Sequence, residues 1–210
     1  MTNPKSKSDL LSKTTQSYCE SWLKEKLYNR EKEFTNKYVQ KGIIVEDNSI
    51  DVIANQLGYG MLFKNEIKFE NDFLTGTPDI ITNDKIIDAK SSWDVFTFPL
   101  FDESPNPLYG WQGQGYMNLT DKKKFAVCYV LVDTPEHMIE SEMRRYAWSM
   151  GYEYDDLNYG QFYKKMTYAD IPEQYRIKTF EFDYDQTKID SVQNRVLECR
   201  EFIDYLIKKL

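Results

Sequence analysis

Hydrophobic positions along the chain recur with two periods, one typical of helices and one typical of strands. Apolar residues spaced three, four and seven apart predict amphipathic helices, most clearly in the stripe that runs to Leu210. Short alternating or continuous apolar runs predict strands, and the run FAVCYVLV suits a strand buried on both faces. The expected helices are 16–40, 39–57, 107–120, 136–150 and 189–210. The expected strands are 66–70, 73–81, 85–90, 125–132 and 177–184.

This order of elements predicts one α/β domain, with a mixed central β-sheet flanked by helices. We expect the domain to span 15–210 after a flexible tail over 1–14, since 210 residues suit a single domain. Hydrophobic residues make up 41% of the chain, enough for a packed core. The sequence has no apolar run of membrane-spanning length and no signal-peptide pattern, so we expect no membrane contact and a cytoplasmic location.

Composition excludes several classes of site. The sequence has one histidine and three scattered cysteines, which argues against catalytic triads, His-rich zinc sites and a disulfide framework. The net charge of −7 argues mildly against nucleic acid, because phosphate binding depends on Lys and Arg. The N-terminal segment over 1–41 is nevertheless basic, and it is a candidate for contact with a phosphate backbone.

The segment 76–90 carries the clearest candidate chemistry, because two apolar runs flank a polar turn. If the turn has a two-residue loop, Asp79 lies directly opposite Asp88, and Lys90 points to the same side. Opposed like charges destabilise a hairpin, so something must compensate. A divalent cation such as Mg²⁺ or Mn²⁺ would do so. The alternative is that Lys90 neutralises the pair in a purely structural role.

Glu46 interrupts the apolar stripe of the helix expected over 39–57. It lies seven residues after Val39 and four before Ile50, and so on the apolar face. A buried, unpaired carboxylate is costly, so it tends to persist where it is paired or binds a metal. The alternative is a side chain at the edge of the stripe that reaches solvent. Taken together, three carboxylates and a lysine favour a metal site.

These residues resemble the PD-(D/E)XK nuclease superfamily. Pro78-Asp79 matches its PD element and Asp88-Ala89-Lys90 its (D/E)XK element, while GTPD over 76–79 resembles the phage recombination branch. The stretch from Gly42 to Glu46 resembles the upstream helix that contributes another acidic ligand.

The segment 109–120 extends the resemblance to lambda-exonuclease-like and YqaJ-type viral recombinases, in which a Gln-x-Gln-x-Tyr helix follows the active strand. Gln112 and Tyr116 also fit the QxxxY motif of RecB-type nucleases. The chain departs from the pattern in having Asp88 where Glu is commoner, and in having Gly113 and Gly115 within the helix.

The resemblance implies a restriction-endonuclease-like core and metal-dependent hydrolysis of DNA phosphodiester bonds. Asp79, Asp88, Glu46 and the backbone carbonyl of Ala89 would hold Mg²⁺ or Mn²⁺. Lys90 would orient or deprotonate the attacking water, or neutralise charge at phosphorus. Gln112 is expected among the catalytic residues, with a hydrogen bond near the active site, and Tyr116 and Gln114 are expected to support the site.

The same resemblance implies an exonuclease of phage-type recombination or DNA end resection, in the host cytoplasm if the chain is phage-encoded. Such nucleases are often paired with a single-strand annealing recombinase and can form a homo-oligomeric ring. Two alternatives stay open: a restriction-type or structure-specific endonuclease, and a non-catalytic DNA-binding or partner-docking protein that retains the fold. The complete set of acidic residues and lysine argues against the second.

Contacts with DNA are harder to place from the sequence. Trp93 belongs to an aromatic cluster that would either stack on bases or pack under a long loop. Lys122, Lys123 and Lys124 would touch phosphate or form a solvated turn. Residues 134–175 carry no motif.

Overall fold

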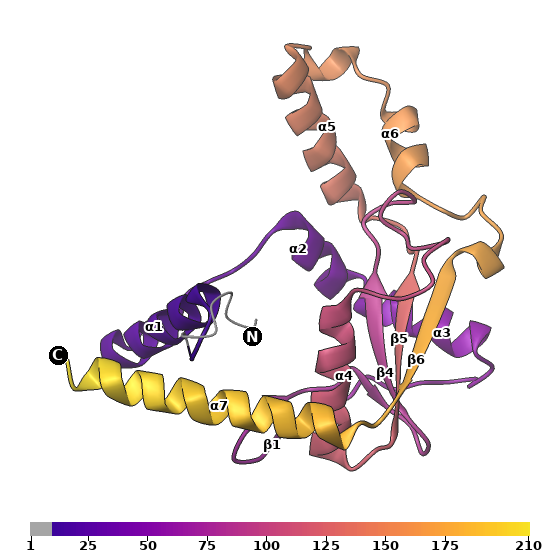
Figure 1. Ribbon diagram of the computed structural model, residues 1–210. Coiled ribbons are helices and arrows are strands. Elements are labelled where there is room, and N and C mark those ends of the chain that lie inside the picture. Colours follow the sequence, from indigo (N-terminus) through magenta and orange to yellow (C-terminus); the bar gives the residue numbers. More distant parts are fainter. Residues whose placement is uncertain (1–9) are drawn as a thin grey trace. The chain divides into compact units, whose positions relative to one another are not determined.

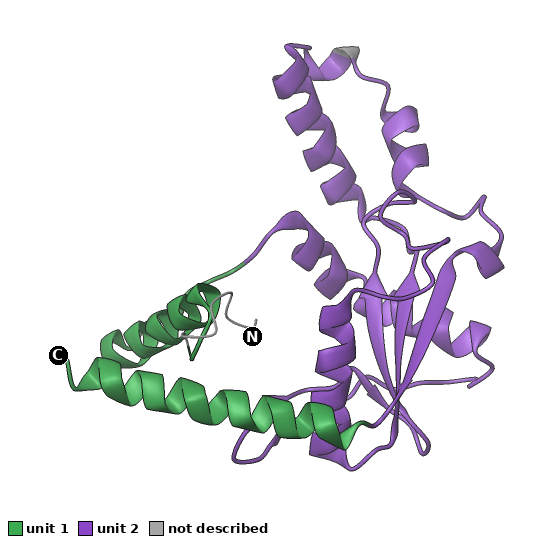
Figure 2. Ribbon diagram, viewed as in Figure 1, with its two compact units in different colours: residues 1–34, 185–210 green, residues 35–184 purple. Residues whose placement is uncertain are grey.

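The computed structural model describes residues 10–210, which form two compact units. One unit combines the described residues up to Phe34 with Asp185–Leu210, and the other is the continuous segment Thr35–Tyr184 (Figure 2). The span 15–210, expected as one domain, is therefore divided between two units. Every helix within residues 10–210 is too short or too polar to cross a bilayer.

The first unit is built on two helices, α1 (Lys13–Tyr28) and α7 (Gln186–Ile207). Both begin at a side-chain cap, because the Ser12 hydroxyl accepts from the Thr15 amide and the Asp185 carboxylate accepts from the Thr187 amide. The C-terminal stripe thus forms the helix that the sequence predicts. The apolar residues packed between the two helices are Leu11, Cys19, Cys199, Phe202 and Ile203.

The structure corrects two expectations for the N-terminal region. The helix expected over 16–40 ends at Tyr28, because Asn29 adopts a left-handed conformation (φ 48°) and a polar stretch without an apolar stripe follows. Of the tail expected over 1–14, residues 1–9 lie outside the described part of the chain. The remainder is packed, since Leu11 is only 2% exposed and Ser12 caps α1.

The second unit holds a mixed sheet with strand order β3-β4-β5-β6 (Figure 1). The central pair, β4 and β5, is parallel, and each neighbours an antiparallel partner. A small antiparallel pair, β1 and β2, lies outside this sheet. The strand expected over 73–81 is split in two around Pro78, which has no amide hydrogen to donate to a ladder. The strands are β1 (Phe69–Glu70), β2 (Thr75–Gly76), β3 (Ile80–Ile81), β4 (Ile86–Ser91), β5 (Lys124–Val130) and β6 (Ile177–Asp183).

Alternate residues of the central strands feed separate apolar clusters. Ile87 packs with Ile50 and Ile53 of helix α3 (Glu46–Gln56), while Ile86 packs with Met117 of helix α4 (Pro107–Thr120). The run FAVCYVLV is buried as predicted, with the residues from Phe125 to Cys128 fully inaccessible. This sheet, with helices packed on it, confirms the mixed α/β fold class.

The stripe expected as one helix over 39–57 is two helices, α2 (Lys37–Ile44) and α3 (Glu46–Gln56). The break lies at Val45, whose backbone (φ −101°, ψ 12°) ends one helix and begins the next. Glu46 is therefore the first residue of α3 and not a gap in a continuous apolar face. An acidic residue at that position is favourable, because helix N-termini carry partial positive charge.

The glycine-rich helix α4 (Pro107–Thr120) forms despite its low helix propensity, because glycine allows it to pack closely on the sheet. A Cβ atom at Gly113 would lie 2.2 Å from the ring atom Cδ1 of Phe125. On a neighbouring segment, a Cβ atom at Gly76 would lie 2.6 Å from Cε1 of Tyr116. Gly113, which weakens the helix in isolation, is thus required by the contact of α4 with the sheet.

The segment without a motif forms α5 (Glu136–Met150), the short helix η1 (Tyr154–Asp156), α6 (Tyr159–Met166) and the short helix η2 (Glu173–Tyr175). Helix α5 ends at Gly151, whose positive φ of 71° favours glycine. Helices α5 and α6 pack together, with the rings of Tyr146 and Phe162 edge to face at 5.4 Å.

We predict opposite effects for two glycine substitutions in α4. Gly113→Ala should lower the free energy of unfolding by about 1–3 kcal/mol, because the methyl group overlaps the Phe125 ring. Gly115→Ala should raise it by up to about 1 kcal/mol, since its nearest contact, Leu74 Cδ1, is 4.0 Å away. Urea denaturation of both variants tests this, and equal effects would contradict the packing argument.

Candidate active site

The β3–β4 hairpin has the register that the sequence predicts. Ile80 pairs with Ile87 and Ile81 with Ile86. The turn is closed by the Thr82 amide, which donates to the Lys85 carbonyl at 2.9 Å. The predicted pair of aspartates therefore lies just beyond the last paired residues of β3.

Asp79 is fixed against the strand that carries the other acidic residue. Its Oδ2 accepts a hydrogen bond of 2.8 Å from the backbone amide of Ala89. Its own carbonyl accepts from the Asn65 amide at 2.7 Å. The Asp79 carboxylate thus accepts the hydrogen bond from β4 that a backbone carbonyl of a paired strand would normally accept.

Asp88 and Lys90 point to the same face of β4, two residues apart, as alternation requires. Asp88 is completely buried, and its Oδ2 lies 2.6 Å from the Lys90 ammonium nitrogen. Neither Asp88 oxygen makes a hydrogen bond of ordinary geometry within residues 10–210. The ammonium also lies 5.0 Å from the centre of the Tyr109 ring, a favourable cation–π contact.

The electrostatics reflect two carboxylates sharing a dry site. Burial, followed by repulsion from Asp88, raises the pKa of Asp79 from 3.8 to about 7. Burial also raises the pKa of Asp88, although attraction to Lys90 opposes the shift. Burial alone would lower the pKa of Lys90, but the neighbouring carboxylates outweigh it and raise the value. Lys90 is therefore an ammonium at neutral pH.

A cavity of about 490 Å³ opens beside these groups, and Glu46 lies in its wall with Asp79 and Lys90. The Glu46 Oε2 atom is 2.7 Å from the Lys64 ammonium nitrogen. Within residues 10–210, no group of three or more His, Cys, Asp and Glu side chains is gathered closely enough to hold a metal ion. The structure thus brings together Asp79, Asp88 and Lys90, and places Glu46 on the same cavity with a lysine partner.

The apolar residues of α2 also belong to this cavity. Val39 and Ile43 line it together with Gly42. The apolar stripe over 39–57 predicts a helix that faces the core. At the α2 end of the stripe, these apolar residues face the candidate site instead, which explains why Ile43 is exposed.

The expected supporting residues divide into two groups. Gln112 donates to the Tyr116 hydroxyl at 2.9 Å, so the predicted i, i+4 contact forms on one face of α4. Neither of these residues lines the cavity. Gln114 is buried and donates to the Asp183 carbonyl at 2.8 Å, which ties α4 to the end of β6.

The candidate DNA contacts are separated in the fold. Trp93 lines the cavity, together with Tyr109 and Tyr129. The three lysines lie near the opposite end of the parallel strands, where Lys122 donates to the Asn83 carbonyl and Lys124 begins β5. Lys123 pairs with Asp121 at 3.0 Å. None of these lysines lines the cavity.

The structure adds one residue that the sequence analysis missed. Lys41 of α2 is fully buried, and its ammonium donates to the carbonyls of Ser92 and Trp93 at 2.9 Å each. Burial lowers its pKa to about 8, although Asp94 and Asp133 oppose the shift. Lys41 thus fixes α2 to the segment that follows the strand of Asp88 and Lys90. A lysine next to an apolar helix face is no signal by itself, so the sequence does not reveal this contact.

Similarity to known structures identifies the family. No protein-family model matches the chain, and no curated protein matches it either. A phage-related exonuclease from Haemophilus somnus 129PT is 30% identical, over 99% of this chain and 91% of that chain, with a TM-score of 0.80. The chain belongs to the phage-related exonuclease family. This family member is therefore a nuclease, which is the general activity that the sequence predicts.

More distant structures share the fold of this phage-related exonuclease. The alkaline exonuclease LHK-Exo from Laribacter hongkongensis is 15% identical, over 96% of this chain and 89% of that chain, with a TM-score of 0.63. LHK-Exo in complex with dAMP is also 15% identical, over 92% and 84% of the two chains, with the same TM-score. These matches agree with the mixed sheet and flanking helices described above.

The raised pKa of Asp79 predicts a pH-dependent stability of the protein in EDTA. The folded state retains a proton that the unfolded chain releases, so this group's contribution to the free energy of unfolding is lost as pH rises from about 4 to about 7. Asp79→Asn should show a smaller loss than wild type in urea denaturation between pH 5 and 8. The control is Asp102→Asn on an exposed loop, which should follow wild type. Parallel curves for all three proteins would contradict the shift.

Proposed function

We propose that this chain is a Mg²⁺- or Mn²⁺-dependent exodeoxyribonuclease of the PD-(D/E)XK type, which hydrolyses DNA phosphodiester bonds. The observation that carries the proposal is the convergence of Asp79, Asp88 and Lys90 on one face of the β3–β4 hairpin, next to an open cavity. Two carboxylates and an ammonium in a buried setting match the chemistry of phosphoryl transfer better than a structural ion pair, which would need one carboxylate only.

The donor set fits a hard divalent cation. Asp88 has buried carboxylate oxygens without an ordinary hydrogen bond. Asp79, Ala89 and Lys90 line the cavity beside it. Asp79 and Asp88 would hold the ion with the backbone carbonyl of Ala89. Glu46 would join them by giving up its ion pair with Lys64 and binding the ion. A bound Mg²⁺ would supply polarisation of the scissile phosphate and a lowered pKa of the attacking water.

Lys90 acts as a cation in this proposal. Its pKa is raised by the two carboxylates, so it holds its proton at neutral pH and is a poor base. Its ammonium would donate hydrogen bonds to the attacking water or to a phosphate oxygen, where negative charge develops. The contact with Asp88 and the Tyr109 ring fixes the direction in which it points.

The broader setting is proposed on the family relationship. We assign DNA as substrate, phage-type recombination or end resection as role, and the cytoplasm as location. A single-strand annealing recombinase is the proposed partner, and a homo-oligomeric ring is the proposed assembly. Exposed apolar side chains such as Phe34, Phe63 and Phe101 are compatible with further protein contacts.

Cleavage assays with Lys90→Ala test the catalytic assignment. We expect cleavage of linear duplex DNA in Mg²⁺ to fall at least about 100-fold, because a charge-stabilising donor is lost. The control variant Lys68→Ala removes an exposed lysine and should cleave like wild type. Closed circular plasmid should resist wild type, as expected for an exonuclease. Unchanged cleavage by Lys90→Ala would refute the site, and rapid cutting of the circle would indicate an endonuclease.

Thermal unfolding with Mg²⁺ or Mn²⁺ tests the metal site without measuring activity. An ion that binds only the folded state stabilises it by about 2.7 kcal/mol at 100 times its Kd, so Tm should rise relative to EDTA. Asp88→Asn should lose most of the rise, whereas Asp102→Asn should keep it. Identical Tm values for wild type in EDTA and in either metal would exclude binding by this cluster.

A further inference from the structure

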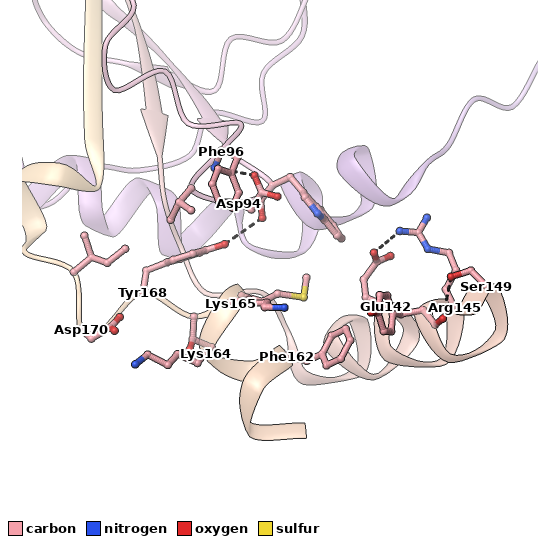
Figure 3. A pocket seen from close by; sticks show the side chains of 16 residues that line it. Asp94, Phe96, Glu142, Arg145, Ser149, Phe162, Lys164, Lys165, Tyr168 and Asp170 are labelled. Atoms are coloured by element: carbon pink, nitrogen blue, oxygen red, sulfur yellow. Dashed lines mark hydrogen bonds and ion pairs between the residues drawn. The ribbon is translucent and has the colours of Figure 1, made fainter. Parts of the chain in front are cut away.

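The segment without a sequence motif lines a large cavity in the second unit. Helices α5 and α6, the loop at 167–171 and the loop after β4 surround a space of about 740 Å³ (Figure 3). This volume lies within the range of small-molecule sites. The pocket is distinct from the 490 Å³ cavity of the candidate active site, although one residue lines both.

Aromatic side chains from separate elements contribute to the lining. Phe96 comes from the loop after β4, Tyr146 from α5, Phe162 from α6 and Tyr168 from the segment that follows α6. Phe96 is 93% exposed, so its ring has open faces at the mouth of the pocket. A flat, solvent-exposed ring beside a cavity provides a surface on which a nucleobase can stack.

Both cations and anions line the pocket, and they differ in the contacts that they make. Glu142 is already engaged by Lys37 at 2.9 Å and by Arg145. The Asp94 carboxylate accepts from the amides of Phe96 and Thr97 and so serves to form the loop. By contrast, Lys164 and Lys165, in the last turn of α6, make no ion pair within residues 10–210. Lys165 also lies 5.6 Å from the centre of the Phe162 ring, a cation–π contact that leaves its ammonium able to bind an anionic ligand such as a phosphate.

Trp93 connects this pocket to the candidate active site, because it lines both cavities. Its carbonyl accepts hydrogen bonds from the Lys41 ammonium at 2.9 Å and from the Tyr168 hydroxyl at 3.2 Å. The Trp93 backbone is therefore held both by α2 and by the segment that follows α6. Trp93 follows Lys90 by three residues, which span at most about 11 Å. A strand with its phosphate at Lys90 therefore has neighbouring nucleotides within reach of the pocket.

We propose that this pocket binds unpaired nucleotides of single-stranded DNA next to the scissile phosphate. A base stacks against Phe96 and the other aromatic lining, and Lys164 and Lys165 contact the phosphates. The pocket thereby selects an unpaired strand end over a continuous duplex, since bases inside a duplex are already stacked. The inference extends the proposed nuclease function to the nature of the substrate end and gives α5 and α6 a role.

Binding of a fluorescently labelled oligothymidylate in EDTA tests the stacking contact without cleavage. Phe96→Ala should weaken binding about tenfold, in line with the loss of one base–aromatic stack. Phe101→Ala is the matched control, because Phe101 is 91% exposed on the same loop region but does not line the pocket. Both side chains are exposed, so neither substitution removes core packing. Equal binding by the two variants would overturn the proposal.

The salt dependence of the same binding tests the phosphate contacts. For single strands, each phosphate contact contributes about 0.7 to the slope of log K against log salt concentration. The double variant Lys164→Gln/Lys165→Gln should lower that slope by about 1.4. The control Lys208→Gln/Lys209→Gln changes charge equally at two neighbouring lysines of the other unit and should keep the wild-type slope. An unchanged slope in the first variant would overturn the phosphate contacts.

These measurements separate the pocket from the nuclease assignment. If wild type degrades linear DNA in Mg²⁺ but the pocket variants bind oligothymidylate normally, the pocket proposal fails and the nuclease stands. If the pocket variants lose binding while wild type cleaves nothing in Mg²⁺ or Mn²⁺, the nuclease assignment fails and single-strand binding by the pocket stands.

Discussion

The approach of two carboxylates on the β3–β4 hairpin is the interaction on which the candidate site depends. The two-residue turn sets the register, and the register places Asp79 over the backbone of Ala89 and beside the buried Asp88. Lys90 can balance only one negative charge, and burial beside Asp88 raises the pKa of Asp79 to about 7, so a proton on Asp79 neutralises the second carboxylate below that pH. Apolar packing on both faces of β4 offsets the unfavourable burial of these charged groups.

That anchoring relies on close contact between backbone and ring. Gly113 lets α4 lie directly on Phe125, and the crossover from β4 through α4 to β5 then makes the central strands parallel. Gln114 adds a polar tie from the same helix to the end of β6. The helix motif that marks the nuclease resemblance therefore also contributes to packing, because Gly113 and the buried Gln114 both hold α4 against the sheet.

The features that follow from local rules are predictable from the sequence. A polar turn between two apolar runs fixes the hairpin register, period-two alternation puts Asp88 and Lys90 on one face, and a continuous apolar run marks the buried strand at 125–132. The break between α2 and α3 is not predictable, because Val45 carries no helix-stopping signal. The burial of Lys41, the Glu46–Lys64 pair and the pocket of α5 and α6 depend on contacts between distant segments, which periodicity does not encode.

The buried ammonium of Lys41 has a mechanical consequence. Its two hydrogen bonds join α2, which lines the cavity of the candidate active site, to Ser92 and Trp93, and Trp93 lines both cavities. Sliding of α2 along the sheet must break both bonds and leave a dry cation without acceptors, which is strongly unfavourable. The position of α2 is therefore coupled to that of Trp93, so a shift of the helix that widened one cavity would also displace the wall of the other.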